Sequence, residues 1–350
     1  MTRLLSFPGP LLAALFLLVI AASKVTAGEL HATPAQAPTA APRAPMMDVA
    51  RAGDRIVAVG DHGVVLLSDD DGQSFRQARS VPVSSLLTGV AFADARHGWA
   101  VGHWGVIVAT EDGGETWTLQ RVDTAVDRPL FSIVMLDGRE GVAVGLWSLI
   151  LRTTDGGATW TAVTVPSPPE GGRADRNLFH VFPTGGRSLM VAAERGTVLA
   201  SDDGGLTWRY RTTGGTGSLW TGTTLDDGAI LVGGLRGRMF RSDDHGATWQ
   251  ALPLEGTESV TAIRDFGAGA VAVVGLDGMT ARSNDGGRHF RTRIRDDRLA
   301  LTAILETRAG PLLLSDQGVG GGGGARPPPA PSSRPPPGGG GVYPPPTAGP

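Results

Sequence analysis

The sequence predicts an all-β fold, a seven-bladed β-propeller whose blades are four-stranded antiparallel sheets. Two observations lead to this prediction. An octapeptide of the type "TEDGGETW" occurs six times, and seven short strands with a similar beginning recur along the chain. Each octapeptide follows a pair of short β-type runs and precedes a more polar run. Repeats of about 40 residues with four strands each are typical of propeller blades.

The octapeptides begin at residues 68, 110, 153, 201, 242 and 283, so their spacings are 42, 43, 48, 41 and 41 residues. The longest interval contains the insertion "PSPPEGGRADRN" at 166–177, which its Pro and Gly residues mark as a loop. The spacing therefore indicates one octapeptide in each of the first six blades.

The octapeptides fit the pattern S/T-x-D-x-G-x-T/S-W/F, which is similar to the Asp box of sialidase-type repeats. In a tight hairpin, the hydroxyl and the carboxylate can accept backbone N–H bonds, and Gly can take a positive φ. The closing aromatic ring can be buried against neighbouring strands. We therefore predict a structural role for the six aspartates of this pattern, which are Asp70, Asp112, Asp155, Asp203, Asp244 and Asp285.

The innermost strands of the blades are expected to begin at "MDVA", "LTGV", "FSIV", "FHVF", "WTGT", "VTAI" and "LTAI". Since neighbouring side chains of a strand point to opposite faces, the first, apolar residue is expected to pack between blades. The second, polar residue is expected to line the central channel. The predicted channel residues are Asp48, Thr88, Ser132, His180, Thr221, Thr261 and Thr302.

The last blade is incomplete in the sequence pattern. Residues 311–319 supply its second strand, but a Gly/Pro-rich run follows in place of a seventh octapeptide. Either residues near 30–44 complete this blade as an added strand, or the blade stays partly open with an exposed edge.

The two ends of the chain differ from the repeats. Residues 1–27 resemble a signal peptide, with Arg3, an apolar run at 11–22 and "VTA" at 25–27, although an uncleaved anchor is the alternative. An Ala/Pro-rich linker is expected at 28–44, the propeller at 45–319 and a disordered Gly/Pro-rich tail at 320–350. We therefore expect an exported protein, located in the periplasm or outside the cell, or on the lumenal side in a photosynthetic organism.

Composition excludes several classes of function. The chain has no cysteine, so disulfides, thiol nucleophiles and thiolate metal sites are excluded. A net charge of −3 gives no global basic field for nucleic acid. The run "DDDG" at 69–72 lacks the alternating ligands of a calcium loop, and His62 and His103 are too few to indicate a metal. No cofactor or metal is expected.

From about residue 45 to 319, "AVGxxG" turns followed by "SDDGGxTW" boxes resemble the photosystem II assembly and stability factor family. The resemblance implies an exported seven-bladed propeller without catalytic residues. It also implies an assembly chaperone or scaffold for membrane or exported protein partners, monomeric and at most peripheral to the membrane.

The alternative is an Asp-box glycan-binding protein or a sialidase-like glycoside hydrolase. Sialidases use a tyrosine nucleophile, yet Tyr210 is the only tyrosine before the tail and is expected on an outer strand. A hydrolase with two carboxylates could use residues among Asp61, Glu194 and Asp277, which sequence alone does not bring together.

Candidate partner-binding residues lie in the turns between the second and third strands of the blades. These turns are expected to share one face with the connections between blades. Blades 2 and 3 offer Trp104 and Trp147, and blades 4 and 5 offer Arg195, Arg236 and Arg238. Trp and Arg dominate binding hot spots, and together they suit an extended peptide that carries acidic groups. The alternative is that these residues are packing lids or solvated charges.

Overall fold

A computed structural model describes residues 33–35 and 41–321. The chain divides into two units, Met1–His31 and Ala32–Pro350, and all of the described residues belong to the second unit. The predicted signal peptide, most of the predicted linker and nearly all of the predicted tail therefore lie outside the described residues.

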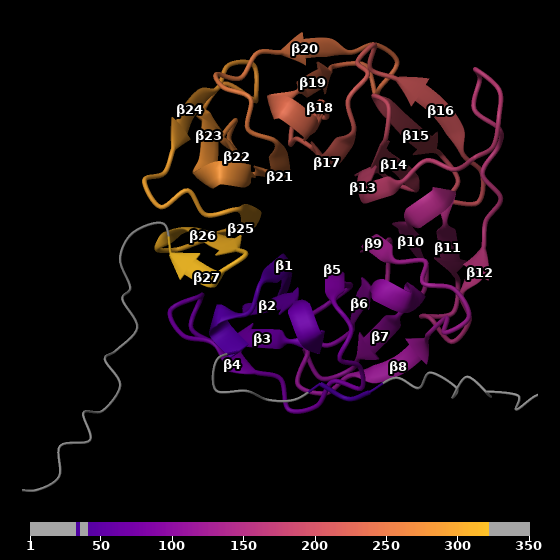
Figure 1. Cartoon of the computed structure of the whole chain (residues 1–350), viewed down its shortest axis with the longest axis vertical. Helices are drawn as coiled ribbons and strands as arrows, with labels where there is room; N and C mark the ends of the chain where they lie inside the picture. The colour runs from indigo at the N-terminus through magenta and orange to yellow at the C-terminus, as the bar shows by residue number, and fades with distance from the viewer. Residues whose placement is uncertain (1–32, 36–40, 322–350) are drawn as a thin grey trace, which may run out of the picture. The chain divides into compact units, whose positions relative to one another are not determined.

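The described residues form seven antiparallel sheets arranged in a ring (Figure 1). Six sheets have four strands and the seventh has three. The predicted seven-bladed propeller is confirmed. Its strands run from Met46 to Gly321, compared with the predicted bounds of 45 and 319.

The strands follow the chain from blade to blade, innermost strand first. Blades 1 and 2 contain β1 (Met46–Ala52), β2 (Arg55–Gly60), β3 (Val65–Ser68), β4 (Arg76–Gln77), and β5 (Leu87–Phe92), β6 (Gly98–Gly102), β7 (Ile107–Thr110), β8 (Thr118–Arg121). Blades 3 and 4 contain β9 (Leu130–Met135), β10 (Gly141–Gly145), β11 (Ile150–Thr153), β12 (Thr161–Ala162), and β13 (Leu178–Gly185), β14 (Ser188–Ala193), β15 (Thr197–Ser201), β16 (Arg209–Thr212). Blades 5 and 6 contain β17 (Leu219–Thr224), β18 (Ile230–Gly234), β19 (Met239–Ser242), β20 (Gln250–Leu252), and β21 (Val260–Asp265), β22 (Val271–Gly275), β23 (Met279–Ser283), β24 (Arg291–Ile294). Blade 7 contains β25 (Leu301–Thr307), β26 (Gly310–Ser315) and β27 (Gly318–Gly321).

Short 3-10 turns join the second and third strands of five blades. They are η2 (Asp61–Gly63), η3 (His103–Gly105), η4 (Leu146–Ser148), η5 (Leu235–Gly237) and η6 (Leu276–Gly278), and η1 (Ala41–Arg43) precedes blade 1. Within the described residues, no helix is long and apolar enough to cross a membrane.

One hydrogen bond ties the turn between the second and third strands to the start of the innermost strand in all seven blades. In blade 1, Asp61 N–H donates to the Pro45 carbonyl at 2.9 Å, and in blade 2, His103 N–H donates to the Leu86 carbonyl at 3.0 Å. The turns therefore share one face of the ring with the connections between blades, as expected from the sequence. We call this face the η face.

The octapeptides close the outer hairpins through a repeated set of hydrogen bonds. In the third copy, Thr153 Oγ1 donates to Asp155 Oδ1 at 2.8 Å and accepts from Gly157 N–H at 2.9 Å. Asp155 also accepts from Thr159, from N–H at 2.9 Å and from Oγ1 at 2.7 Å. These bonds, first among them the one from the Thr159 hydroxyl, lower the pKa of Asp155 to about 2. The carboxylate is therefore ionised at neutral pH and accepts three hydrogen bonds within its own hairpin.

The hydrophobic core lies between neighbouring blades, and the octapeptide aromatic of each blade packs toward the preceding blade. Trp117 of blade 2 is only 3% exposed and belongs to the same cluster as Val57 and Leu67 of blade 1. Such a ring is present at six of the seven interfaces between blades. In the cluster between blades 6 and 7, none of the described residues is an octapeptide aromatic.

The ring closes where blade 7 meets blade 1. Thr302 Oγ1 donates to the Met46 carbonyl and Arg51 Nη2 donates to the Glu306 carbonyl, each at 2.7 Å. Residues 41–43 form the turn η1 beside β27 and do not pair with it as a strand. Of the two alternatives from sequence, the described residues show a three-stranded, partly open blade.

The predicted alternation along the innermost strands holds in three blades and is wrong in four. The first, apolar residue is buried between blades as expected at Leu87, Val260 and Leu301, but not at Met47, Phe131, Phe179 and Trp220. Every innermost strand has a β-bulge near its start, so one residue has no partner on the second strand. The bulged residues are Met47, Thr88, Phe131, Phe179, Trp220, Thr261 and Thr302. The seven predicted channel residues therefore occupy two positions: Thr88, Thr261 and Thr302 are bulged, while Asp48, Ser132, His180 and Thr221 come one residue later.

Candidate functional site

The first candidate region is a cavity of about 220 Å³ at the centre of the ring. All seven predicted channel residues line it, together with Arg264. The bulged apolar residues Met47, Phe131, Phe179 and Trp220 line it too, which corrects the expectation that they pack between blades. The bulge is the physical reason, because the extra residue breaks the two-residue alternation that the prediction assumed.

Most polar side chains of the central cavity join neighbouring blades. Thr88 Oγ1 donates to the Leu130 carbonyl of the next blade at 2.6 Å. Asp48 Oδ2 accepts from Val90 N–H at 3.0 Å. An innermost strand has an unpaired edge, and these side chains satisfy its backbone groups. The geometry of the cavity therefore gives its polar lining a structural role.

The charged groups of the cavity do not form a catalytic pair. Burial raises the pKa of Asp48, although Arg264, whose guanidinium lies 3.6 Å from the carboxylate, opposes this effect. Burial and then the positive charge of Arg264 lower the pKa of His180 to about 3, so its ring is neutral at physiological pH. Asp48 is the one carboxylate among the lining residues, whereas a glycosidase of the common type needs two.

The buried histidine predicts a specific pH dependence of stability. Because the folded-state pKa of His180 lies below its ordinary value of 6.5, the unfolded chain binds more protons below that pH. Stability should therefore fall as the pH drops from 6.5 toward 3. Between pH 7 and pH 5, the wild type is expected to lose up to about 2 kcal/mol more than His180→Gln. Urea unfolding at both pH values measures this difference. The opposite effect of Asp48 is common to both proteins, and equal losses would contradict the prediction.

The second candidate region is the η face. The middle residue of the turn between the second and third strands has a left-handed backbone in six of the seven blades. These residues are His62, Trp104, Trp147, Arg195, Arg236 and Asp277, with φ between 53° and 59°. For a residue other than Gly this conformation costs about 1–2 kcal/mol. Backbone strain of this kind concentrates at functional sites, so the residues of these turns are candidates for a binding role.

The two candidate tryptophans differ in their surroundings. Trp147 is 52% exposed at the tip of η4. Trp104 is half-buried and packs against the core cluster between blades 1 and 2. Its turn is fixed by the bond from Trp104 N–H to Asp127 Oδ1 at 2.8 Å. Trp104 therefore acts as a packing lid, whereas the ring of Trp147 is accessible.

The three candidate arginines are all exposed on the η face. Within the part of the chain that the structure describes, the guanidinium groups of Arg195, Arg236 and Arg238 make no ion pair and no hydrogen bond. The neighbouring carboxylate of Glu194 is hydrogen-bonded to Asn177. It accepts from the side-chain Nδ2 of Asn177 at 2.9 Å and from the backbone N–H of Asn177 at 3.1 Å. Trp147 and these arginines lie on three consecutive blades, and we call them the blade 3–5 surface.

The carboxylates of the hydrolase alternative lie apart and are already paired. Asp61 pairs with His62 at 2.9 Å, and Asp277 pairs with Arg298 at 2.5 Å. Together with Glu194 they belong to the turns of blades 1, 6 and 4. Tyr210 lies on the outer strand β16, and none of these residues is among those that line the central cavity.

Metal-binding groups are also not brought together. Among residues 33–35 and 41–321, no three His, Asp or Glu side chains are placed to hold a metal ion. The acidic run at 69–71 is used within the fold: Asp69 pairs with Arg55 and Asp71 with Arg51, while Asp70 belongs to its octapeptide.

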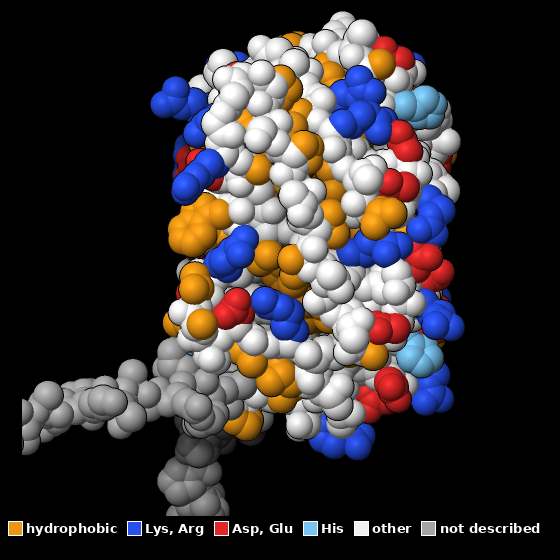
Figure 2. Space-filling view, turned by 90° about the vertical axis from the view of Figure 1, so that its right-hand side faces the viewer, with side chains coloured by type: hydrophobic (Ala, Val, Ile, Leu, Met, Phe, Trp, Pro, Cys, Tyr) orange, Lys and Arg blue, Asp and Glu red, His pale blue; other side chains and the backbone are white. Residues whose placement is uncertain are grey.

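The surface charge is mixed. On the side of the ring seen in Figure 2, basic and acidic side chains alternate with apolar ones, and neither sign forms a continuous patch. This pattern gives that side no extended field for a polyanion.

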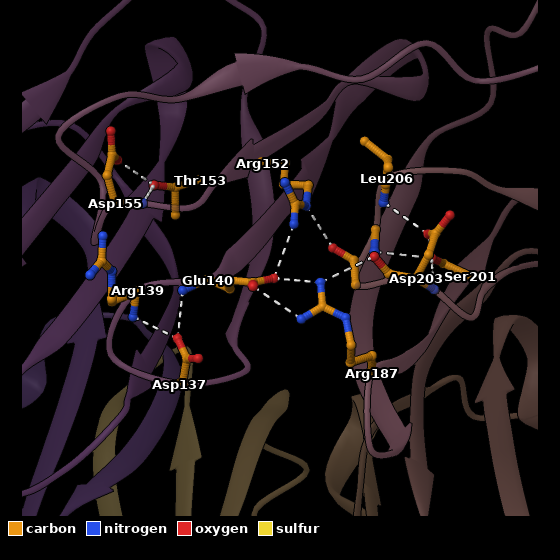
Figure 3. A network of polar contacts seen from close by, with 12 residues as sticks. Asp137, Arg139, Glu140, Arg152, Thr153, Asp155, Arg187, Ser201, Asp203 and Leu206 are labelled. Atoms are coloured by element: carbon orange, nitrogen blue, oxygen red, sulfur yellow. Dashed lines mark hydrogen bonds and ion pairs between the residues drawn. The ribbon is translucent and has the colours of Figure 1, made fainter.

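Sequence reasoning missed the arginines that directly precede an octapeptide. Arg152 Nε donates to the Gly204 carbonyl in the octapeptide of blade 4 at 2.9 Å (Figure 3). Arg152 also pairs with Glu140 at 3.0 Å, and Glu140 pairs with Arg187 at 2.7 Å. Arg241, which is 2% exposed, donates in the same way to the Gly286 carbonyl of blade 6. The available signal was that Arg152, Arg241 and Arg282 have the same offset from an octapeptide.

Comparison with known proteins identifies the family. A family model described as photosynthesis system II assembly factor YCF48 matches residues 77–251, which is half of the chain. The chain belongs to the YCF48 family. This confirms the resemblance seen in the sequence, and the match extends from β4 to β20, so it includes the whole blade 3–5 surface.

Two solved structures of YCF48 share the propeller fold. One, described as YCF48 bound to D1 peptide, has a TM-score of 0.65 and 19% identity, over 82% of this chain and 94% of that chain. The other, YCF48 from Cyanidioschyzon merolae, has a TM-score of 0.64 and 17% identity, over 82% of this chain and 97% of that chain. No curated protein matches the sequence.

Proposed function

We propose that this YCF48-family chain is an exported, non-enzymatic binding scaffold that holds an extended segment of a membrane or exported protein during assembly. The observation that carries the proposal is the blade 3–5 surface, where three guanidinium groups that have no acceptor among the described residues lie on the same face as the exposed ring of Trp147. The D1 peptide bound to a related YCF48 structure supports a protein segment as the ligand.

The chemistry of the surface suits an acidic extended peptide. Each guanidinium can form two parallel hydrogen bonds with a carboxylate, which are among the stronger polar contacts in proteins. The indole of Trp147 supplies a rigid apolar platform. Because Trp147, Arg195 and Arg236 belong to tight turns, little backbone entropy is lost on binding.

The test compares peptide binding by the wild type and by the triple variant Arg195→Ala/Arg236→Ala/Arg238→Ala. The probes are the D1 peptide of the related structure and an array of extramembrane segments from membrane proteins of the same organism. The wild type is expected to select acidic segments, and the triple variant to bind them at least 100-fold more weakly, because three charge-assisted contacts are lost.

Arg139→Ala/Arg308→Ala is the matched control. These arginines lie in turns between first and second strands, at the opposite face of the ring. The control should bind like the wild type, and both variants should keep the melting temperature. Equal binding by the triple variant would refute this surface, and turnover of a fluorogenic glycoside panel by the wild type would refute a non-enzymatic role.

A further inference from the structure

A groove of about 790 Å³ opens at the rim of the ring between blades 6 and 7. Its apolar floor includes Ala272 and Val274 of β22 and Ile304 and Leu313 of blade 7. Arg282 of β23 and Arg291 and Arg293 of β24 line the blade 6 side, together with Arg295, Asp296 and Asp297, which directly follow β24. We call this the 6/7 groove.

The 6/7 groove lies where the repeat pattern is interrupted. At every other interface between blades, an octapeptide aromatic of the following blade fills the outer part of the core. Among the described residues, blade 7 has three strands and no octapeptide, so nothing of this kind enters the groove. The groove therefore lies at the position that a hairpin with its aromatic ring takes at the other interfaces.

Arg282 shows what chemistry is missing. It stands directly before the octapeptide of blade 6, as Arg152 does in blade 3 and Arg241 in blade 5. Those two arginines donate to a glycine carbonyl in the octapeptide of the next blade (Figure 3 shows Arg152). The guanidinium of Arg282 is exposed and has no hydrogen bond or ion pair within the described part of the chain.

The arginines of the groove also repel one another. Arg282 and Arg291 are direct partners in the register of β23 and β24, and Arg293 is the next residue on the same side of β24. Like charges directly opposite each other destabilise a sheet. Only Arg295 is neutralised, by Asp297 at 2.5 Å, whereas Arg282, Arg291 and Arg293 have no ion pair in the described residues. A negatively charged ligand would relieve this repulsion.

We propose that the 6/7 groove binds an extended, acidic segment of a partner protein that carries one large aromatic side chain. The aromatic ring occupies the apolar floor, in the place that an octapeptide aromatic takes at the other interfaces. Backbone carbonyls of the segment accept from Arg282, and its carboxylates pair with Arg291 and Arg293. This site is separate from the blade 3–5 surface and does not depend on it.

The tail of this chain is a poor occupant of the groove. Residues 322–350 contain no Asp or Glu, and they add two positive charges, Arg326 and Arg334. They also contain eleven prolines, which have no N–H to donate to a strand partner. Charge and backbone chemistry therefore favour a segment from another protein.

The test is fluorescence anisotropy with the full chain and a labelled extended peptide that has one Trp between two pairs of acidic residues. Two matched peptides replace the Trp by Ala or the acidic residues by Lys. We expect the first peptide to bind more than tenfold more tightly than either matched peptide, and its affinity to fall with added salt. The variant Arg282→Ala/Arg291→Ala/Arg293→Ala should bind it at least tenfold more weakly, with a melting temperature no lower than that of the wild type.

The control variants separate this site from the blade 3–5 surface. Because the blade 3–5 surface is itself proposed to bind acidic segments, these controls are scored at the groove: Arg195→Ala/Arg236→Ala/Arg238→Ala and Arg139→Ala/Arg308→Ala should leave the yield of cross-links from this peptide to β22, β23 or β26 within twofold of the wild type. A photoreactive group in place of the Trp should cross-link to β22, β23 or β26. No binding, unchanged binding by the groove variant, or loss confined to the blade 3–5 variant would overturn the proposal. A tenfold gain in affinity on deletion of residues 322–350 would instead show that the tail occupies the groove.

Discussion

Trp117→Ala is expected to lower the free energy of unfolding by about 3–5 kcal/mol, the usual cost of truncating a fully buried large aromatic. The indole is 3% exposed and packs in the core between blades 1 and 2, edge-on to Phe92 with the ring centroids 6.3 Å apart. Its Nε1 donates to the Gly114 carbonyl at 2.9 Å, so truncation also removes a buried hydrogen bond. Equilibrium unfolding in urea, followed by tryptophan fluorescence and far-UV circular dichroism, measures the change.

Trp147→Ala is the matched control for this prediction. The same residue type is removed, but the ring of Trp147 is 52% exposed, so stability should change by no more than about 0.5 kcal/mol. Equal losses in the two variants would mean that the octapeptide aromatics do not hold the blades together. A stable Trp147→Ala protein also allows its effect on peptide binding to be measured.

Arg241→Ala is expected to lower the free energy of unfolding by about 2–3 kcal/mol. The side chain is 2% exposed and links the Gly286 carbonyl of blade 6 to Asp227 and Asp243 of its own blade. Removal leaves a buried carbonyl without its donor and removes the packing of the aliphatic stem. The two aspartates are 47% and 62% exposed, so water can solvate them and the loss stays below that of a fully buried ion pair.

Arg282 occupies in blade 6 the strand position that Arg241 occupies in blade 5, but the next blade has no octapeptide among the described residues. Arg282→Ala therefore tests this position without the contact to a glycine carbonyl. Because the Arg282 guanidinium is exposed and unpaired there, we expect a change within about 0.5 kcal/mol. Arg241→Met keeps most of the stem and should recover part of the loss. If Arg241→Ala were as mild as Arg282→Ala, the contact between arginine and glycine carbonyl would not be a stabilising link between blades.

The blade count could be predicted from sequence because each blade repeats the same local signals. The strand pairs, the Gly-flanked turns and the octapeptides all depend on residues close together in the chain. The details of the innermost strands could not be predicted in the same way. A bulge is a property of pairing between two strands, and the run from Phe131 to Ser132 looks like ordinary alternation until its partner strand is seen.

The η face was also predictable, but the environment of its side chains was not. The turns at Trp104 and Trp147 share the sequence Gly-x-Trp and a left-handed backbone at the tryptophan. One ring packs into a core cluster and the other is exposed, because the segments that approach the two turns differ. Likewise, Arg241 and Arg282 have the same local sequence context, and only the following blade decides whether the guanidinium is buried.

The seam between blades 7 and 1 has a consequence for biosynthesis. Ile56, Ala58 and Leu66 of blade 1 are covered by Leu312 and Leu314, more than 240 residues later in the chain. On the ribosome, that apolar surface of the first blade stays uncovered until the last blade has been translated. Closure is therefore a late event with a high entropic cost, and the nascent chain is exposed to misassembly and to holdase chaperones for nearly the whole of translation.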